Sequence, residues 1–129
     1  IIASDHAPHT IREKALIWEK APFGLIGLET TLALVLTHLV KPGLLTMSQA
    51  IKKMSILPAK IFRLKAGSLA LGSKADIIII DPKKKWTISS SKFYSKGRNC
   101  PFDEWEVQGK AVMTIVKGKI VMKDNEIIV

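Results

Sequence analysis

Hydrophobic positions in the first half of the chain follow helical spacing. They recur every three or four residues over 28–39, which predicts a helix that ends before the Pro-Gly pair at 42–43. Thr46 or Ser48 can cap a second helix. Pro58 is a residue type favoured in a first helical turn, so we expect a third, short helix to begin there.

After residue 65 the pattern changes to that of strands. The run over 75–80 is almost wholly apolar and β-branched, which predicts a strand buried on both faces. Apolar segments on either side of Lys117-Gly118 predict a hairpin, and a last strand is expected over 126–129. The chain therefore divides into a strand-plus-helices part, residues 1–64, and an all-β part, residues 65–129.

The first four residues form an apolar run that predicts a short buried strand. This strand should end at Asp5, because Pro8 prevents any continuation. A chain that opens on Ile1, in the middle of such a run, is expected to be a fragment of a longer protein.

Charge and composition exclude several classes of function. The net charge of +9 would suit nucleic acid, but the lysines are dispersed and no RNA- or DNA-binding motif accompanies them. The one dense run, Lys83 to Lys85, looks like a solvated turn. No apolar run is long enough to cross a membrane and no signal peptide is recognisable. We therefore expect neither a nucleic-acid partner nor a membrane.

Cysteine usage favours a reducing, cytoplasmic setting. With a single cysteine, Cys100, the chain cannot form an internal disulfide. Cys100 lies in a segment that looks like a loop, and nothing around it suggests a catalytic nucleophile.

Two polar residues near the start are candidates for catalysis. Asp5 follows an apolar strand, the place where barrel enzymes carry catalytic groups, although an aspartate there can equally cap the following turn. His9 lies four residues later and can face the same cavity, where an imidazole can bind a carboxylate or a metal. His6 alternates away from Asp5 and His38 lies on a helical pattern, so both are expected to be structural.

Metal ligation cannot be completed by this sequence alone. No two histidines are spaced i, i+2 or i, i+4, and there is no cysteine pair. Catalytic zinc usually takes three protein ligands, so further ligands would have to come from elsewhere.

Several motifs of the chain resemble dihydroorotases of the bacterial, multi-domain type, which are cyclic amidohydrolases. The quite specific ones are Asp5-His6-Ala7-Pro8-His9-Thr10 with Pro22-Phe23-Gly24 and Gly27-Leu28-Glu29-Thr30. Residues 93–99 resemble the narrower branch of dihydroorotases and allantoinases, whereas the Gly-Ser and Ala-Asp element at 67–76 is common to the superfamily. The similarity covers essentially the whole chain.

This resemblance implies a fold and a set of residue roles. Residues 1–64 would be the last strand and terminal helices of a (β/α)8 barrel, an α/β fold, and residues 65–129 would supply strands to a small composite β-sandwich. Asp5 would ligate zinc and shuttle a proton. His9 would hold the carboxylate of the substrate, and the Phe23-Gly24 backbone would hydrogen-bond the pyrimidine ring. From the residues alone, Phe23-Gly24 can also be a plain turn.

The implied activity is the interconversion of N-carbamoyl-L-aspartate and (S)-dihydroorotate in pyrimidine biosynthesis, with the isolated fragment inactive. Implied partners are the small-molecule substrate, the remainder of the barrel, further copies in a homo-oligomer and aspartate carbamoyltransferase. Two alternatives stay open: an allantoinase or hydantoinase-like cyclic amidase, and a non-catalytic scaffold of a carbamoyltransferase. His9 and the Pro-Phe-Gly at 22–24 argue against the first, and retention of Asp5 with His9 argues against the second.

Overall fold

A computed structural model describes residues 1–128, and its first half contains two main helices. In the first, α2 (Thr31–Val35) continues without a break into η1 (Leu36–Val40), and in the second α3 (Met47–Ile51), η2 (Lys52–Ile56) and α4 (Leu57–Ile61) follow one another directly. A single turn, α1 (Ile11–Lys14), precedes both. The helix expected to end before residues 42–43 is confirmed.

Thr46 caps the second helix, as one of the two expected candidates. Its hydroxyl accepts the N–H of Gln49 at 3.2 Å, and the Gln49 side chain accepts the N–H of Thr46 at 2.8 Å. This reciprocal capping box satisfies two N–H groups that a helix start otherwise leaves unpaired.

The short helix expected at Pro58 is present as α4, with Pro58 in its first turn, but it follows η2 without a break and ends at Ile61 rather than near Leu64. The turn before it, η2, is π-helical, and the N–H of Leu57 reaches back to the carbonyl of Lys52. Proline lacks an N–H and its ring crowds the preceding turn. A widened π turn relieves that crowding, so the helix continues to Ile61.

The second half forms one antiparallel sheet in the order β1-β2-β3-β4. The strands are β1 (Ile77–Thr87), β2 (Glu106–Val116), β3 (Lys119–Lys123) and β4 (Glu126–Ile127), and η3 (Ser90–Lys92) follows β1. The hairpin at Lys117-Gly118 is confirmed: both residues have positive φ, 49° and 79°, the turn geometry that matches strand twist. Of the last expected strand, Val129 lies outside the described residues.

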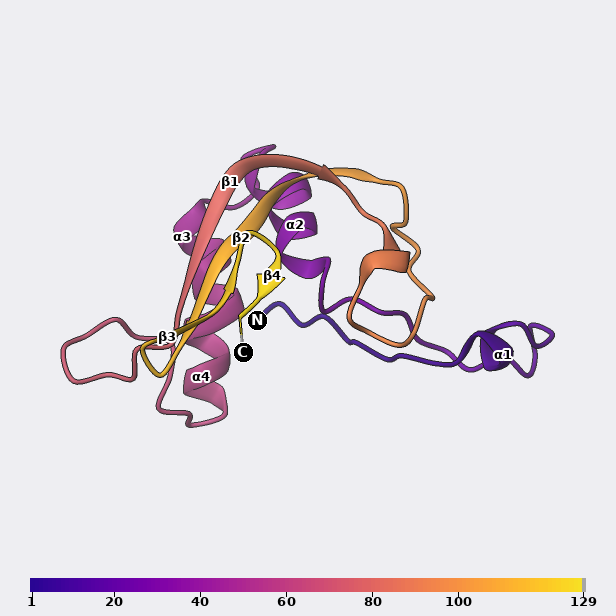
Figure 1. The fold of residues 1–129 in the computed structure, drawn as a ribbon, viewed down its shortest axis with the longest axis horizontal. Coiled ribbons are helices and arrows are strands. Elements are labelled where there is room, and N and C mark those ends of the chain that lie inside the picture. The colour runs from indigo at the N-terminus through magenta and orange to yellow at the C-terminus, as the bar shows by residue number, and fades with distance from the viewer. Residues whose placement is uncertain (129) are drawn as a thin grey trace.

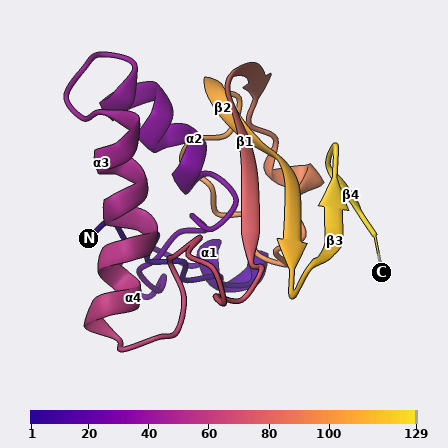
Figure 2. The same ribbon diagram turned by 90° about the vertical axis from the view of Figure 1, so that its left-hand side faces the viewer.

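Two expectations about β1 are wrong. The strand begins at Ile77 and is not buried on both faces, since Ile78 and Ile79 are 50% and 45% exposed. Helices cover one side of the sheet (Figure 2), which leaves the opposite face open within this chain. Lys83 to Lys85 belong to β1 rather than to a turn, at an irregularity where the Asp81 carboxylate accepts the N–H groups of Lys83 and Lys84.

The strand predicted over the first four residues does not form within the described chain. Ile1 is 55% exposed, and these residues are extended but belong to no ladder. Within residues 1–128, the nearest pairing is a single parallel bridge between His6 and Leu25. A strand requires a neighbouring strand, whereas the backbone hydrogen bond of residues 1–4 runs from the N–H of Ile2 to the carbonyl of Lys53 in η2, at 3.1 Å.

The core lies between α2 and the sheet. Its centre is Ala33, Ile88 and Val107, each at most 3% exposed. The approach of helix to strand requires Gly109, because a Cβ there would lie 2.9 Å from the Cβ of Leu36. This packing fixes the base from which the remaining N-terminal segment projects.

Residues 5–27, here called the arm, project from this base, with α1 near the tip of the arm and far from the sheet (Figure 1). The loop between β1 and β2, which includes η3, runs beside the base of the arm. Among residues 1–128, no helix has the length and apolar character needed to cross a membrane. All four residues proposed for the active site belong to the arm.

Candidate active site

His6 holds the two sides of the arm together. Its bridge to Leu25 is extended by the N–H of Ala7, which donates to the Leu25 carbonyl at 2.9 Å. Its Nδ1 accepts the N–H groups of Gly27 and Leu28, both at 3.2 Å. His6 therefore has the structural role expected for it, and it brings the segment of Asp5 and His9 alongside the segment of Phe23 and Gly24.

The structure places His9 beside Gly24. A Cβ built on Gly24 would lie 3.4 Å from Cδ2 of His9 and 2.7 Å from the Cβ of Ala7. Gly24 has a φ of 122°, a conformation that side chains other than glycine rarely adopt. The imidazole of His9 and the backbone of Gly24, fifteen residues apart in sequence, therefore lie next to each other.

Glu13 is the charged residue next to His9. Its carboxylate lies 3.9 Å from Nδ1 of His9 and accepts both the N–H and the hydroxyl of Thr10 at 2.8 Å. These hydrogen bonds from Thr10 lower the pKa of Glu13, so it is a carboxylate at neutral pH. At 3.9 Å Nδ1 makes no hydrogen bond to Glu13, and Nε2 of His9 has no hydrogen-bond partner within the described chain, so the imidazole is open to a ligand.

Asp5 and Phe23 are positioned but make no such contacts. Asp5 is exposed and has a φ of 45°, and no hydrogen bond or ion pair joins it to His9 within the described chain. The Phe23 side chain is 92% exposed, so the local geometry leaves its ring uncovered. The structure therefore places His9 beside Gly24. Asp5 lies four residues before His9 on the same extended segment.

The residues present fit one ligand of a metal site rather than a complete one. Asp5 offers a single carboxylate, and residues 1–128 contain no group of three histidine, cysteine, aspartate or glutamate side chains able to hold a metal ion. Catalytic zinc takes three protein ligands. We therefore derive no chemical step through a metal from this chain alone.

Sequence reasoning missed three residues that shape the site. Lys14 donates to the carbonyls of Pro22 and Gly24 at 2.9 and 3.3 Å, and Asn99 donates to the Gly24 carbonyl at 2.8 Å. Glu13 was identifiable from the Thr-x-x-Glu spacing of a capping box. The sequence gives no comparable signal for Lys14 or Asn99. Both donate hydrogen bonds to backbone carbonyls, which every residue carries.

The remaining candidates lie away from the arm's site. His38 is exposed on η1 and stacks edge-on against Trp105 at 5.7 Å. Burial raises the pKa of the Cys100 thiol, which disfavours the nucleophilic thiolate. Both fit the structural roles expected for them.

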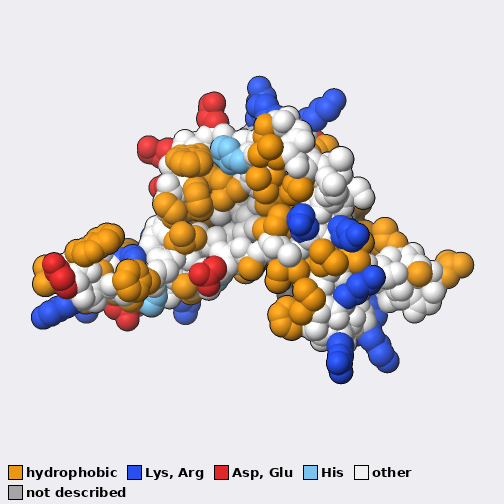
Figure 3. Space-filling view, turned by 180° about the vertical axis from the view of Figure 1, so that it is seen from behind, with side chains coloured by type: hydrophobic (Ala, Val, Ile, Leu, Met, Phe, Trp, Pro, Cys, Tyr) orange, Lys and Arg blue, Asp and Glu red, His pale blue; other side chains and the backbone are white. Residues whose placement is uncertain are grey.

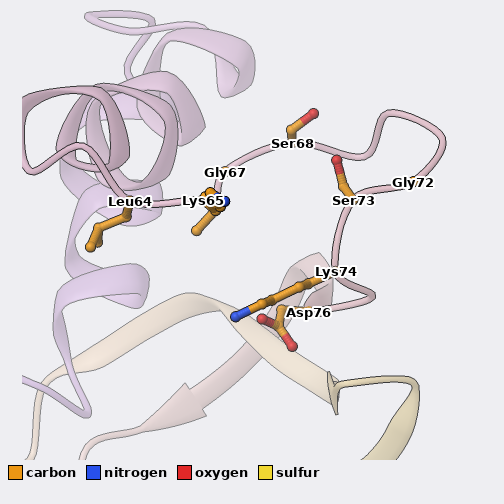
Figure 4. Close-up of a pocket in the computed structure, with 9 residues that line it drawn as sticks. Leu64, Lys65, Gly67, Ser68, Gly72, Ser73, Lys74 and Asp76 are labelled. Carbon is orange, nitrogen blue, oxygen red and sulfur yellow. The ribbon is translucent and has the colours of Figure 1, made fainter.

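A hollow of about 460 Å³ lies elsewhere, between the end of α4 and the start of β1 (Figure 4). Lys74 and Asp76 extend side by side at its floor, and Ser68 and Ser73 lie on its loop. None of the site residues expected from the sequence lines it, so the arm remains the candidate active site.

Gly24 provides a direct test of the arm's geometry. We expect Gly24→Ala to destabilise the whole protein by about 1–3 kcal/mol, because the new Cβ combines a strained φ with a clash against Ala7. Gly43→Ala is the matched control, since Gly43 has a φ of 81° but nothing within 4 Å of the added Cβ. Thermal unfolding should show the larger loss for Gly24→Ala, and equal losses would refute the close approach.

Comparison with known proteins places the chain among enzymes of one kind. The family model described as the amidohydrolase family matches residues 1–121. A curated dihydroorotase from Pyrococcus horikoshii is 48% identical over 99% of this chain, and one from Bacillus caldolyticus is 51% identical over 93%. The chain spans 30% and 28% of the length of these two relatives.

Solved structures with the same fold are hydantoinases and dihydropyrimidinases. An L-hydantoinase (dihydropyrimidinase) from Arthrobacter aurescens has a TM-score of 0.81 at 36% identity and covers 86% of this chain and 25% of its own. A dihydropyrimidinase from Brevibacillus agri has a TM-score of 0.92 at 26% identity, covering 99% of this chain and 29% of its own.

Proposed function

The chain belongs to the amidohydrolase family, and we propose that it is part of a zinc-dependent dihydroorotase that interconverts N-carbamoyl-L-aspartate and (S)-dihydroorotate in pyrimidine biosynthesis. The observation that carries the proposal is the meeting of His9 with the Gly24 backbone. These residues come from the two motifs most specific to dihydroorotases. Their juxtaposition offers a carboxylate-binding imidazole next to a ring-binding backbone.

In this proposal the two parts of the chain have different positions in the whole enzyme. Residues 1–64 are the last strand and terminal helices of a (β/α)8 barrel, and residues 65–129 contribute to a composite β-sandwich. The extended residues 1–4, which have no partner strand within the described chain, and the exposed Ile78 and Ile79 support this placement, because such apolar surfaces need partners.

Apolar side chains also gather over the arm and the body on the face in Figure 3. Trp18 and Phe23, at 87% and 92% exposure, are the extreme cases on the arm. We propose that the remainder of the barrel covers part of this surface and that further copies in a homo-oligomer or aspartate carbamoyltransferase cover other parts. A cytoplasmic location fits a biosynthetic enzyme of this kind.

Each site residue has a defined task in the proposed reaction. Asp5 would be one ligand of the zinc ion, and the ion, completed by ligands from the rest of the enzyme, would supply an activated water for hydrolysis of the ring amide. Asp5, proposed as one metal ligand, accepts a proton during attack and returns it to the departing ring nitrogen. Nε2 of His9 binds the substrate carboxylate, and the backbone at Phe23-Gly24 hydrogen-bonds the ring, where glycine permits close approach.

A hydantoinase-like cyclic amidase is the second candidate, favoured by the structural neighbours. The L-hydantoinase is 36% identical to this chain. The two candidates differ in whether the substrate carries a carboxylate, so His9 is the residue that separates them.

We expect the purified whole enzyme to cyclise N-carbamoyl-L-aspartate, to lose this activity on treatment with a chelator and to regain it with Zn²⁺. The isolated 129-residue chain should show no turnover above a metal-only control, because Asp5 alone cannot hold a catalytic metal. Spectrophotometric assay of dihydroorotate measures both. Failure of the zinc-loaded whole enzyme to turn over dihydroorotate would refute the proposed function.

A further inference from the structure

Asn99 forms hydrogen bonds to the backbone of the candidate site, although it is distant from it in sequence. Its side-chain amide donates to the Gly24 carbonyl at 2.8 Å, and its own carbonyl accepts the N–H of Ile26 at 3.1 Å. Two hydrogen bonds from one residue therefore fix positions 24 and 26. Asn99 lies in the loop between β1 and β2, beside the base of the arm.

The loop that carries Asn99 is itself held in place. The Glu29 carboxylate accepts the N–H groups of Tyr94 and Ser95, both at 3.1 Å. Gly97 sits so close to the arm that a Cβ there would lie 3.0 Å from both Ile26 Cγ2 and Pro8 Cβ. Asn99 therefore acts from a rigid support rather than from a free loop.

The hydrogen bonds at Gly24 leave one of its backbone groups available. Its carbonyl accepts both Asn99 and the Lys14 ammonium, the latter at 3.3 Å, which uses the two lone pairs of the oxygen. The N–H of Gly24 donates to no other group within residues 1–128. The 24–25 peptide is thus anchored through its oxygen, and the Gly24 N–H belongs to the adjoining 23–24 peptide.

The two halves of the Asn99 side-chain amide have different surroundings. Its Oδ1 is buried and has no hydrogen-bond partner in the described structure. The donor half, directed at Gly24, is the part that explains an asparagine here.

We propose that Asn99 is a positioning residue: by fixing the backbone of residues 24–26 it holds Gly24 in place, so that the Gly24 N–H, on the adjoining 23–24 peptide, faces the substrate ring. This inference rests on the proposed function only in requiring that the backbone at Gly24 binds the ring of a cyclic amide. It names Asn99 as the group that aligns this backbone and the Gly24 N–H as the donor.

The test replaces Asn99 in the whole enzyme by leucine, which keeps the branched shape without a donor. Loss of one neutral hydrogen bond should raise KM by about two- to tenfold. The kcat should stay near that of the wild type, because the ring contact is made in ground state and transition state alike. Asn99→Ala, which adds no bulk, gives the same comparison if the leucine variant does not fold.

Asn125→Ala is the matched control. Asn125 is the other asparagine of the chain, exposed in the β3–β4 turn with a φ of 73°, so its replacement should lower Tm without changing KM. A rise in KM for the Asn99 variants alone supports the proposal. An unchanged KM in a folded Asn99 variant, or equal rises in both positions, overturns it.

Dihydroorotate and hydantoin are assayed in parallel to keep the two hypotheses apart. The ring that the wild type prefers tests the proposed function. The role of Asn99 is tested separately, by comparing the KM of the variant with that of the wild type on the preferred substrate, whether that is dihydroorotate or hydantoin.

Discussion

Replacement of Asp5 by asparagine is expected to lower kcat of the whole enzyme by about a hundred- to ten-thousand-fold, the usual contribution of general acid–base catalysis. Asparagine matches aspartate in size but cannot carry the proton or the charge that a metal ligand supplies. It also tolerates the left-handed backbone of this position, where φ is 45°. The fold should therefore survive, and circular dichroism with steady-state kinetics would separate the two effects.

Asp124→Asn is the control for this substitution. Asp124 is exposed in the β3–β4 turn with a φ of 50°, so it reproduces the exchange and the backbone conformation away from the arm. Its kcat should equal that of the wild type. A near-normal kcat for Asp5→Asn would assign the proton transfer to another residue.

His9→Ala should lower kcat/KM for dihydroorotate by about ten- to a hundredfold. This is the effect of losing a charge-assisted hydrogen bond of about 1.5–3 kcal/mol to the substrate carboxylate. Dihydrouracil has the same ring without the carboxylate, so its slow turnover should change little. Parallel kinetics on the two substrates measure the difference.

His38→Ala provides the comparison for His9, because His38 is exposed and its ring packs against Trp105. It should alter neither substrate's kcat/KM. An equal loss on both substrates for His9→Ala would mean that His9 serves the metal or the local architecture. Carboxylate recognition would then have to come from another group.

Local signals in the sequence predicted the elements that depend on local physics. The Thr46 cap, the end of the first helix before residues 42–43 and the hairpin at Lys117-Gly118 are determined by neighbouring residues, and all three are confirmed. The helix at Pro58 was expected to stand alone, but the π turn before it joins it to the preceding helix. That adjustment belongs to the backbone and leaves no mark in a hydrophobic pattern.

Features that depend on distant partners were not predictable in the same way. The apolar run at residues 1–4 has the composition of a strand, but a strand forms only beside another. His9 was expected to share a cavity with Asp5, whereas the structure places it beside Gly24, and the hydrogen bond from Asn99 to Gly24 joins positions 75 residues apart. Nothing in the sequence around Asn99 indicates which carbonyl it binds.

The most direct measurement of the central claim is the substrate preference of the wild-type whole enzyme, loaded with Zn²⁺. We predict that kcat/KM for dihydroorotate exceeds that for dihydrouracil and for hydantoin by at least about tenfold, the low end of the effect of one charge-assisted hydrogen bond. A preference for either neutral ring would contradict the account and identify the enzyme as a hydantoinase-like amidase.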